Sequence, residues 1–101
     1  MPITLHAQPG SLTAVLSGEI DHHGARAMMT QLEEAVAQHL PRHLTLDLSG
    51  VTFMDSSGIA LLLRAYRHMS GFGGTLRVIH IPTQPRRVLD AAGVGRLIQL
   101  E

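Results

Sequence analysis

Apolar and polar side chains alternate at the start of the sequence and then change to a helical period. Residues 3–7 and 12–18 alternate on either side of Pro9-Gly10, which predicts the two strands of a β-hairpin. Over residues 21–40 the apolar positions recur at steps of three and four, which predicts an amphipathic helix that Pro41 helps to end. The chain is therefore expected to open with two strands and a helix.

The second part of the sequence repeats this change of period. Residues 43–48 place leucines at every second position, as in a strand, and a helix is expected from about residue 57 to residue 69. Gly71 and Gly73-Gly74 mark the end of that helix, and residues 75–81 form a further expected strand. Single helices between strands favour a sheet that is parallel over much of its width.

A third helix and a last strand complete the predicted order. Thr83 is the expected N-cap of this helix, Pro85 lies in its first turn, and Gly93 marks its end. The apolar run 96–100 is the last expected strand. The order β-β-α-β-α-β-α-β belongs to the α/β class, with a mixed sheet that is mostly parallel and has an antiparallel N-terminal hairpin. The residues of the third helix expected to face inward are Val88, Leu89 and Ala92.

Length and composition limit the class of protein. The 101 residues accommodate one domain, 1–101, and the apolar fraction of 45% fits a folded chain. The charges of eight acidic and eight basic side chains cancel. The chain therefore has no net positive charge that would favour binding to nucleic acid or to an anionic membrane. The aromatic residues Phe53, Tyr66 and Phe72 are too scattered to form a base-stacking platform. We therefore expect neither nucleic-acid binding nor membrane binding.

Cysteine usage and the first residues indicate the compartment. The sequence has no cysteine, which excludes disulfides and thiolate chemistry. Residues 1–6 lack a basic region followed by a long apolar run, and no window reaches the roughly 20 apolar residues of a membrane helix. We expect a cytoplasmic protein that is neither exported nor anchored by its own sequence.

The residue pattern speaks against the common catalytic sites. A hydrolase elbow needs the pattern G-x-S-x-G, but here only Gly58 follows the serines and Met54-Asp55 stand where the first glycine would be. The seven histidines lack metal-site spacing; His22 and His23, for example, would point about 100° apart on a helix. We expect no catalytic residue, no cofactor and no metal.

Two further motifs have structural explanations. Residues 71–74 resemble part of a phosphate-binding loop, but they follow a predicted helix, whereas such a loop follows a strand, so a helix C-cap and turn explains them better. Glu19 and Asp21 could form an acid–base pair. Asp21 also lies at a predicted helix start, where N-capping explains it without catalysis and still leaves room for a contact role.

The segment Asp55-Ser56-Ser57-Gly58 is the strongest candidate for function. Asp and Ser are all favoured at the N-cap of the second predicted helix, an interaction worth about 1 kcal/mol. Capping needs only one of these residues. A compact polar surface that a partner approaches is therefore an open alternative to simple capping.

Two segments at fixed spacing resemble a known family. Residues 16–23 look like the pattern L-x-G-E-[LI]-D, and residues 46–48 lead into residues 51–58, which look like F-[MI]-D-S-[ST]-G. Together with Gly73-Gly74 before the next strand, these segments resemble the bacterial anti-sigma factor antagonists, the small single-domain members of the STAS family. The resemblance runs over nearly the whole chain.

The resemblance implies a STAS fold and a protein without catalytic activity. Such a protein binds an anti-sigma factor, itself a serine kinase that uses ATP, and so releases a sigma factor. The resemblance implies that Ser56 is the phosphoacceptor, that phosphorylation ends the binding, and that a metal-dependent serine phosphatase reverses it. It also implies that Asp21 lies near the acceptor. The residues expected to bind the partner are Asp21, Asp55, Ser56, Ser57 and Gly58.

Other functions stay open. STAS domains also act as interaction subunits in stress-signalling or lipid-transport complexes without a phosphorylation switch, and an enzyme with Ser56 as nucleophile is the alternative from another class. The sequence departs from many relatives in ending at Glu101, where they carry a further helix. A phosphate on Ser56 would add roughly −1.5 to −2 charges beside a helix N-terminus. We expect it to act at the interface and not by unfolding the protein.

Overall fold

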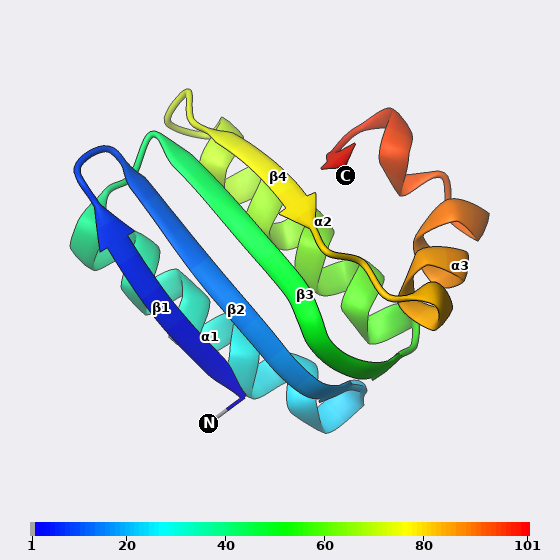
Figure 1. The fold of residues 1–101 in the computed structure, drawn as a ribbon. Coiled ribbons are helices and arrows are strands. Elements are labelled where there is room, and N and C mark those ends of the chain that lie inside the picture. Colours follow the sequence, from blue (N-terminus) through cyan, green and yellow to red (C-terminus); the bar gives the residue numbers. More distant parts are fainter. Residues whose placement is uncertain (1) are drawn as a thin grey trace.

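A five-stranded mixed sheet forms the framework of the protein (Figure 1). The structure is a computed structural model that describes residues 2–101. The strands lie side by side in chain order; the first pair is antiparallel and the other pairs are parallel, which confirms the predicted α/β class and mixed sheet. The elements are β1 (Ile3–Gln8), β2 (Ser11–Ile20), α1 (His22–His39), β3 (His43–Met54), α2 (Ser56–Ser70), β4 (Thr75–Ile79), α3 (Thr83–Ala91), a 3₁₀ turn η1 (Val94–Arg96) and β5 (Gln99–Leu100).

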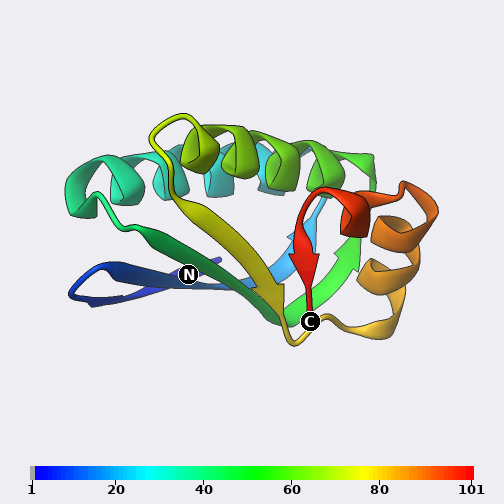
Figure 2. The same cartoon turned by 90° about the horizontal axis from the view of Figure 1, so that it is seen from above.

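Helices α1 and α2 lie side by side and cover one face of the sheet (Figure 2). The alternating leucines of β2 and β3, among them Leu12, Leu16 and Leu46, are fully buried beneath them. Met28 and Leu62 close the layer from the helices. Each fully buried side chain of this size contributes about 1.5–3 kcal/mol, so the hydrophobic pattern fixes which face each element presents.

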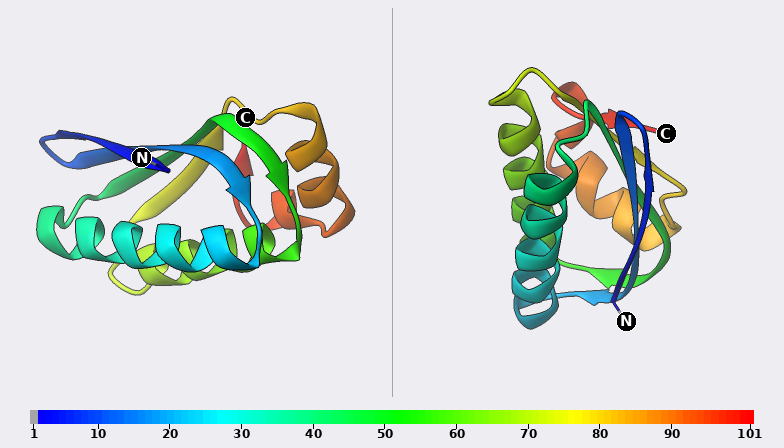
Figure 3. Two further views of the ribbon diagram at one scale, coloured as in Figure 1. Left: turned by 90° about the horizontal axis from the view of Figure 1, so that it is seen from below. Right: turned by 90° about the vertical axis from the view of Figure 1, so that its left-hand side faces the viewer.

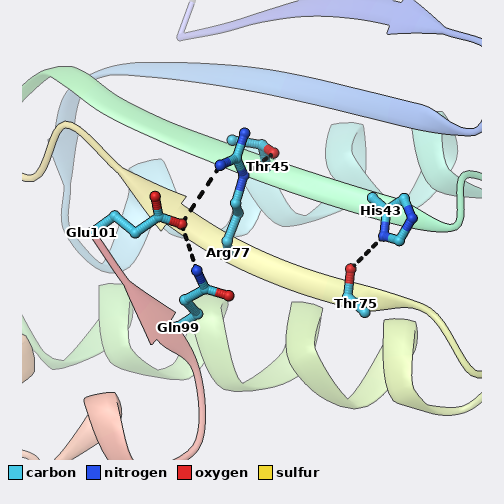
Figure 4. Close-up of polar contacts among 6 residues, drawn as sticks. All are labelled: His43, Thr45, Thr75, Arg77, Gln99 and Glu101. Carbon is cyan, nitrogen blue, oxygen red and sulfur yellow. Dashed lines mark hydrogen bonds and ion pairs between the residues drawn. The ribbon is translucent and has the colours of Figure 1, made fainter.

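Polar side chains cover the opposite face of the sheet, where β3, β4 and β5 run side by side (Figure 4). The Arg77 Nε donates to Thr45 Oγ1 at 3.1 Å, and the Arg77 guanidinium lies 3.6 Å from the carboxylate of Glu101. The His43 ring nitrogen Nδ1 lies 2.7 Å from Thr75 Oγ1. These contacts link β3, β4 and the C-terminal residue across this face, and they lie outside the junction that the motifs single out.

The strand predicted over residues 43–48 is twice as long as expected. β3 continues to Met54, and its pairing with β4 ends where Asp47 faces Ile79. The pairing with β2 continues through two register shifts, and both strands curl toward the helix layer (Figure 3). Bulges of this kind interrupt the strict alternation of apolar and polar residues. The alternation therefore did not predict the second half of the strand.

The C-terminal part differs most from the prediction. Pro82, not Thr83, stands at the N-cap of α3, and it makes no side-chain cap; Leu89 is buried as expected, but Ala92 is exposed. The expected last strand, 96–100, is reduced to the two residues of β5, because the turn η1 takes up its start. α3 packs against β3 and contacts η1, and β5 lies beside β4, so this region is built from contacts between separate elements.

Candidate functional site

The N-termini of α1 and α2 meet at one end of two neighbouring parallel strands. Ile20 ends β2 and faces Met54 at the end of β3, and the Asp55 N–H donates to the Ile20 carbonyl at 3.3 Å. Each strand passes directly into its helix, so Asp21 and Asp55 occupy equivalent positions. The two segments that the motifs single out, far apart in the sequence, therefore form one surface.

Asp21 is the N-cap of α1, as predicted. Its Oδ1 accepts from the Gly24 N–H at 2.8 Å. This hydrogen bond to the ionised carboxylate is the main reason why the pKa of Asp21 lies below its ordinary value. Gly24 is required there, because a Cβ on it would lie within 2.4 Å of the Glu19 carbonyl oxygen. The carboxylate at this corner is therefore charged at neutral pH.

Asp55 caps α2 in the same way. Its Oδ1 accepts from the Ser57 N–H at 2.7 Å. Ser56 is the first residue of the helix, one position earlier than the sequence indicated, and its side chain is exposed, whereas Ser57 is partly buried. No group in residues 2–101 hydrogen-bonds the Ser56 hydroxyl. The capping role thus belongs to Asp55, and the hydroxyl of Ser56 is free for chemistry.

Gly58 has a different role from the one expected. The sequence placed it among the residues expected to bind the partner, but the residue is buried. A Cβ at this position would lie 2.3 Å from Met54 Cγ and 2.7 Å from its Sδ. Gly58 therefore lets the first turn of α2 pack on the end of β3, and it sets the position of Ser56 from below.

Gln84 is a residue of this site that sequence reasoning missed. Its side-chain Oε1 accepts from the Met54 N–H at 2.8 Å, and its Nε2 donates to the Met54 carbonyl at 2.8 Å. β4 no longer pairs with β3 at this point, so the amide of Gln84 takes the place of a neighbouring strand. No local sequence signal could reveal it, because the partners lie 30 residues apart.

A groove of about 280 Å³ runs between α1 and α2 and reaches Ser57. Its charged side chains include Arg26, Glu33 and Arg64, and the last two form an ion pair at 3.2 Å. In the part of the chain that the structure describes, no group of three or more acidic or histidine side chains is arranged to hold a metal ion. Across the same residues, no helix is both long and apolar enough to cross a membrane.

The fold and this pair of capped helix starts define a known class of protein. The sequence model of the family described as "Mlab, STAS domain" matches residues 3–99, so the chain belongs to the STAS domain family. Two of its curated relatives are named anti-sigma F factor antagonists. The anti-sigma F factor antagonist of Paenibacillus polymyxa is 31% identical over 100 residues, which cover 99% of this chain and 86% of the relative. The protein of the same name from Lysinibacillus sphaericus is 30% identical over 80 residues, which cover 79% of this chain and 68% of the relative.

Solved structures show the same fold. An anti-sigma factor antagonist from Mycobacterium paratuberculosis superposes with a TM-score of 0.86 at 28% identity, covering 97% of this chain and 82% of that one. The anti-sigma factor antagonist SpoIIAA in its unphosphorylated form gives a TM-score of 0.83 at 23% identity, covering 98% of this chain and 87% of that one. The phosphorylated form of Bacillus SpoIIAA gives 0.74, again at 23% identity, with 98% and 90% covered. The expected family and fold are confirmed.

Proposed function

We propose that this protein binds an anti-sigma factor that is a serine kinase using ATP, that the binding releases a sigma factor, and that phosphorylation of Ser56 ends it. The observation that carries the proposal is the exposed, unbonded hydroxyl of Ser56 at the first position of α2, beside the caps Asp21 and Asp55. The relatives named anti-sigma F factor antagonists support the identity of the partner.

Electrostatics explains how one phosphate ends binding. The neutral hydroxyl can be buried against a partner at little cost, whereas a phosphate adds roughly −1.5 to −2 charges next to two carboxylates and must be desolvated in the interface. A loss of about 3 kcal/mol lowers affinity more than a hundredfold. In the free protein the N-terminus of α2 stabilises the same charge, so the fold need not change.

The proposed binding surface consists of Asp21, Asp55, Ser56 and Ser57, with Gly58 supporting it from beneath. Both carboxylates keep one oxygen outside the capping hydrogen bond, so each can also accept a donor from the partner. A metal-dependent serine phosphatase would restore the active form in the cytoplasm. A nucleophilic role for Ser56 has less support, because a serine nucleophile needs a base within hydrogen-bond reach and none bonds it in the described chain.

The test is phosphorylation by a cognate anti-sigma kinase. Incubation with the kinase and ATP should add one phosphoryl group, located on Ser56 by peptide mass spectrometry. Ser56→Ala should abolish the gain, and Ser57→Ala, the matched control, should keep it. Ser56→Asp should lose binding to the kinase while its thermal unfolding stays cooperative. Modification of Ser57 in place of Ser56, or melting of the domain by Ser56→Asp, would contradict the proposal.

A second candidate function is an interaction subunit of a larger complex that is never phosphorylated. The description of the matching family supports it. The same mass measurement separates the two candidates, because such a subunit should gain no phosphoryl group on incubation with kinase and ATP.

A further inference from the structure

Phe53 leaves a large apolar surface next to the proposed site. It lies near the end of β3, and the residue is 42% exposed. It is one of only three aromatic residues in the chain. Phe72 is exposed to a similar extent, 47%, but its ring packs edge-on against His68. Within residues 2–101, none of the ring contacts involves Phe53. Isolated exposed apolar residues are common, so its position has to decide whether Phe53 has a role.

The position of Phe53 places it on the surface that carries Ser56. Phe53 and Ser56 are three residues apart, so their Cα atoms are separated by at most about 11 Å. Phe53 pairs with Glu19 of β2, and both are exposed, whereas the next pair, Ile20 and Met54, is buried. The side chains of Phe53 and Glu19 therefore lie on the outer side of these strands, away from the buried layer. Figure 3 shows that both strands curl here before they lead into the helix starts.

A typical protein interface is large enough to include both Ser56 and Phe53. A stable interface buries about 800 Å² on each partner, which corresponds to a patch roughly 30 Å across. A partner centred on Ser56 would therefore reach Phe53. Aromatic side chains are enriched among the few residues that dominate binding, and charged residues surround them at the rim. At this corner the rim would consist of the carboxylates of Glu19, Asp21 and Asp55.

We infer that Phe53 is the hydrophobic anchor of the interface, and that the partner offers an apolar pocket with a basic rim that faces Glu19, Asp21 and Asp55. This inference rests on the proposed function, because the same partner is involved. It also explains the strength of the switch: the burial of Phe53 would force a phosphate on Ser56 out of water at the same time. The anchor and the switch thus act on one binding event.

The test compares two phenylalanines of similar exposure by titration calorimetry with the anti-sigma kinase. Phe53→Ala should weaken binding about thirtyfold or more, as for an interface hot spot, while Phe72→Ala should change it less than threefold. Glu19→Arg, beside the anchor, should weaken binding about tenfold and reduce its dependence on salt. Circular dichroism should show all three variants folded.

The outcomes separate the inference from the function on which it rests. If Ser56→Asp abolishes binding but Phe53→Ala and Glu19→Arg both bind within threefold of the unmodified protein, the anchor is refuted and the switch stands. If the unmodified protein does not bind an anti-sigma kinase at all, the proposed function itself fails. Equal losses for Phe53→Ala and Phe72→Ala would also refute the anchor, because only one of them lies near Ser56.

Discussion

The amide of Gln84 should hold the end of β3 in place, and its removal should destabilise the protein measurably. Gln84→Ala would leave the N–H and the carbonyl of Met54 without the two hydrogen bonds of 2.8 Å that they now make. A hydrogen bond of this kind contributes about 1 kcal/mol net, and an unsatisfied buried group costs about 1–3 kcal/mol. Since Gln84 is only partly buried and water can reach the gap, we expect a loss of about 2 kcal/mol in the free energy of unfolding.

Gln84→Glu sharpens the prediction, because the carboxyl group has the same shape. A carboxylate still accepts from the Met54 N–H, but its second oxygen would face the Met54 carbonyl with no proton between them. A protonated carboxyl can donate there, so the folded state raises the pKa of this group above its unfolded value of about 4.3. Relative to the unmodified protein, Gln84→Glu should therefore be nearly neutral below about pH 4 and lose stability as the pH rises through the raised pKa.

Urea denaturation at several pH values measures both effects. With a slope of about 2 kcal/mol per molar urea, a loss of 2 kcal/mol lowers the midpoint by about 1 M. Gln8→Glu is the matched control, because Gln8 is exposed in β1 and its variant should show no such pH dependence. A urea midpoint for Gln84→Ala within about 0.2 M of that of the unmodified protein would refute the proposed clamp, the pair of hydrogen bonds between the Gln84 amide and the backbone of Met54. A loss of unfolding free energy in Gln84→Glu that does not change with pH would refute it as well.

Further predictions concern packing and charge. Gly58→Ala should cost about 1–3 kcal/mol, because its Cβ overlaps Met54 Cγ; an unchanged melting temperature would contradict the packing role of the glycine. Leu89→Ala should cost about 2–5 kcal/mol in urea denaturation, because this side chain is fully buried; a loss below 1 kcal/mol would show that α3 does not depend on it. For Asp47, partial burial alone would raise the pKa, but the hydrogen bonds from Ser49 and His80 outweigh it and lower the pKa. Its stabilising effect is therefore present above about pH 4 and lost as the pH falls further, so Asp47→Asn should flatten the acid limb of the stability–pH curve.

Much of the secondary structure could be predicted from short stretches of the sequence. The three helices and the hairpin follow from periodicity, since each amphipathic face must be buried somewhere in a chain of this size. Asp21 acts on the N–H of a residue three positions away, so capping was visible in the sequence alone. The same holds for the motif around Ser56, whose residues are consecutive.

Contacts between distant residues needed the tertiary structure. The length of β3, the clamp by Gln84 and the reduction of β5 to two residues depend on which elements lie beside one another, and hydrophobic periodicity holds no information on that. Gly58 shows the same limit: only the position of Met54 reveals that its missing side chain faces the core. The sequence by itself determined the three helices, the Asp21 cap of α1 and the family. The tertiary structure decided which residues share the surface of Ser56, because parallel pairing of β2 with β3 is what brings the two helix starts together.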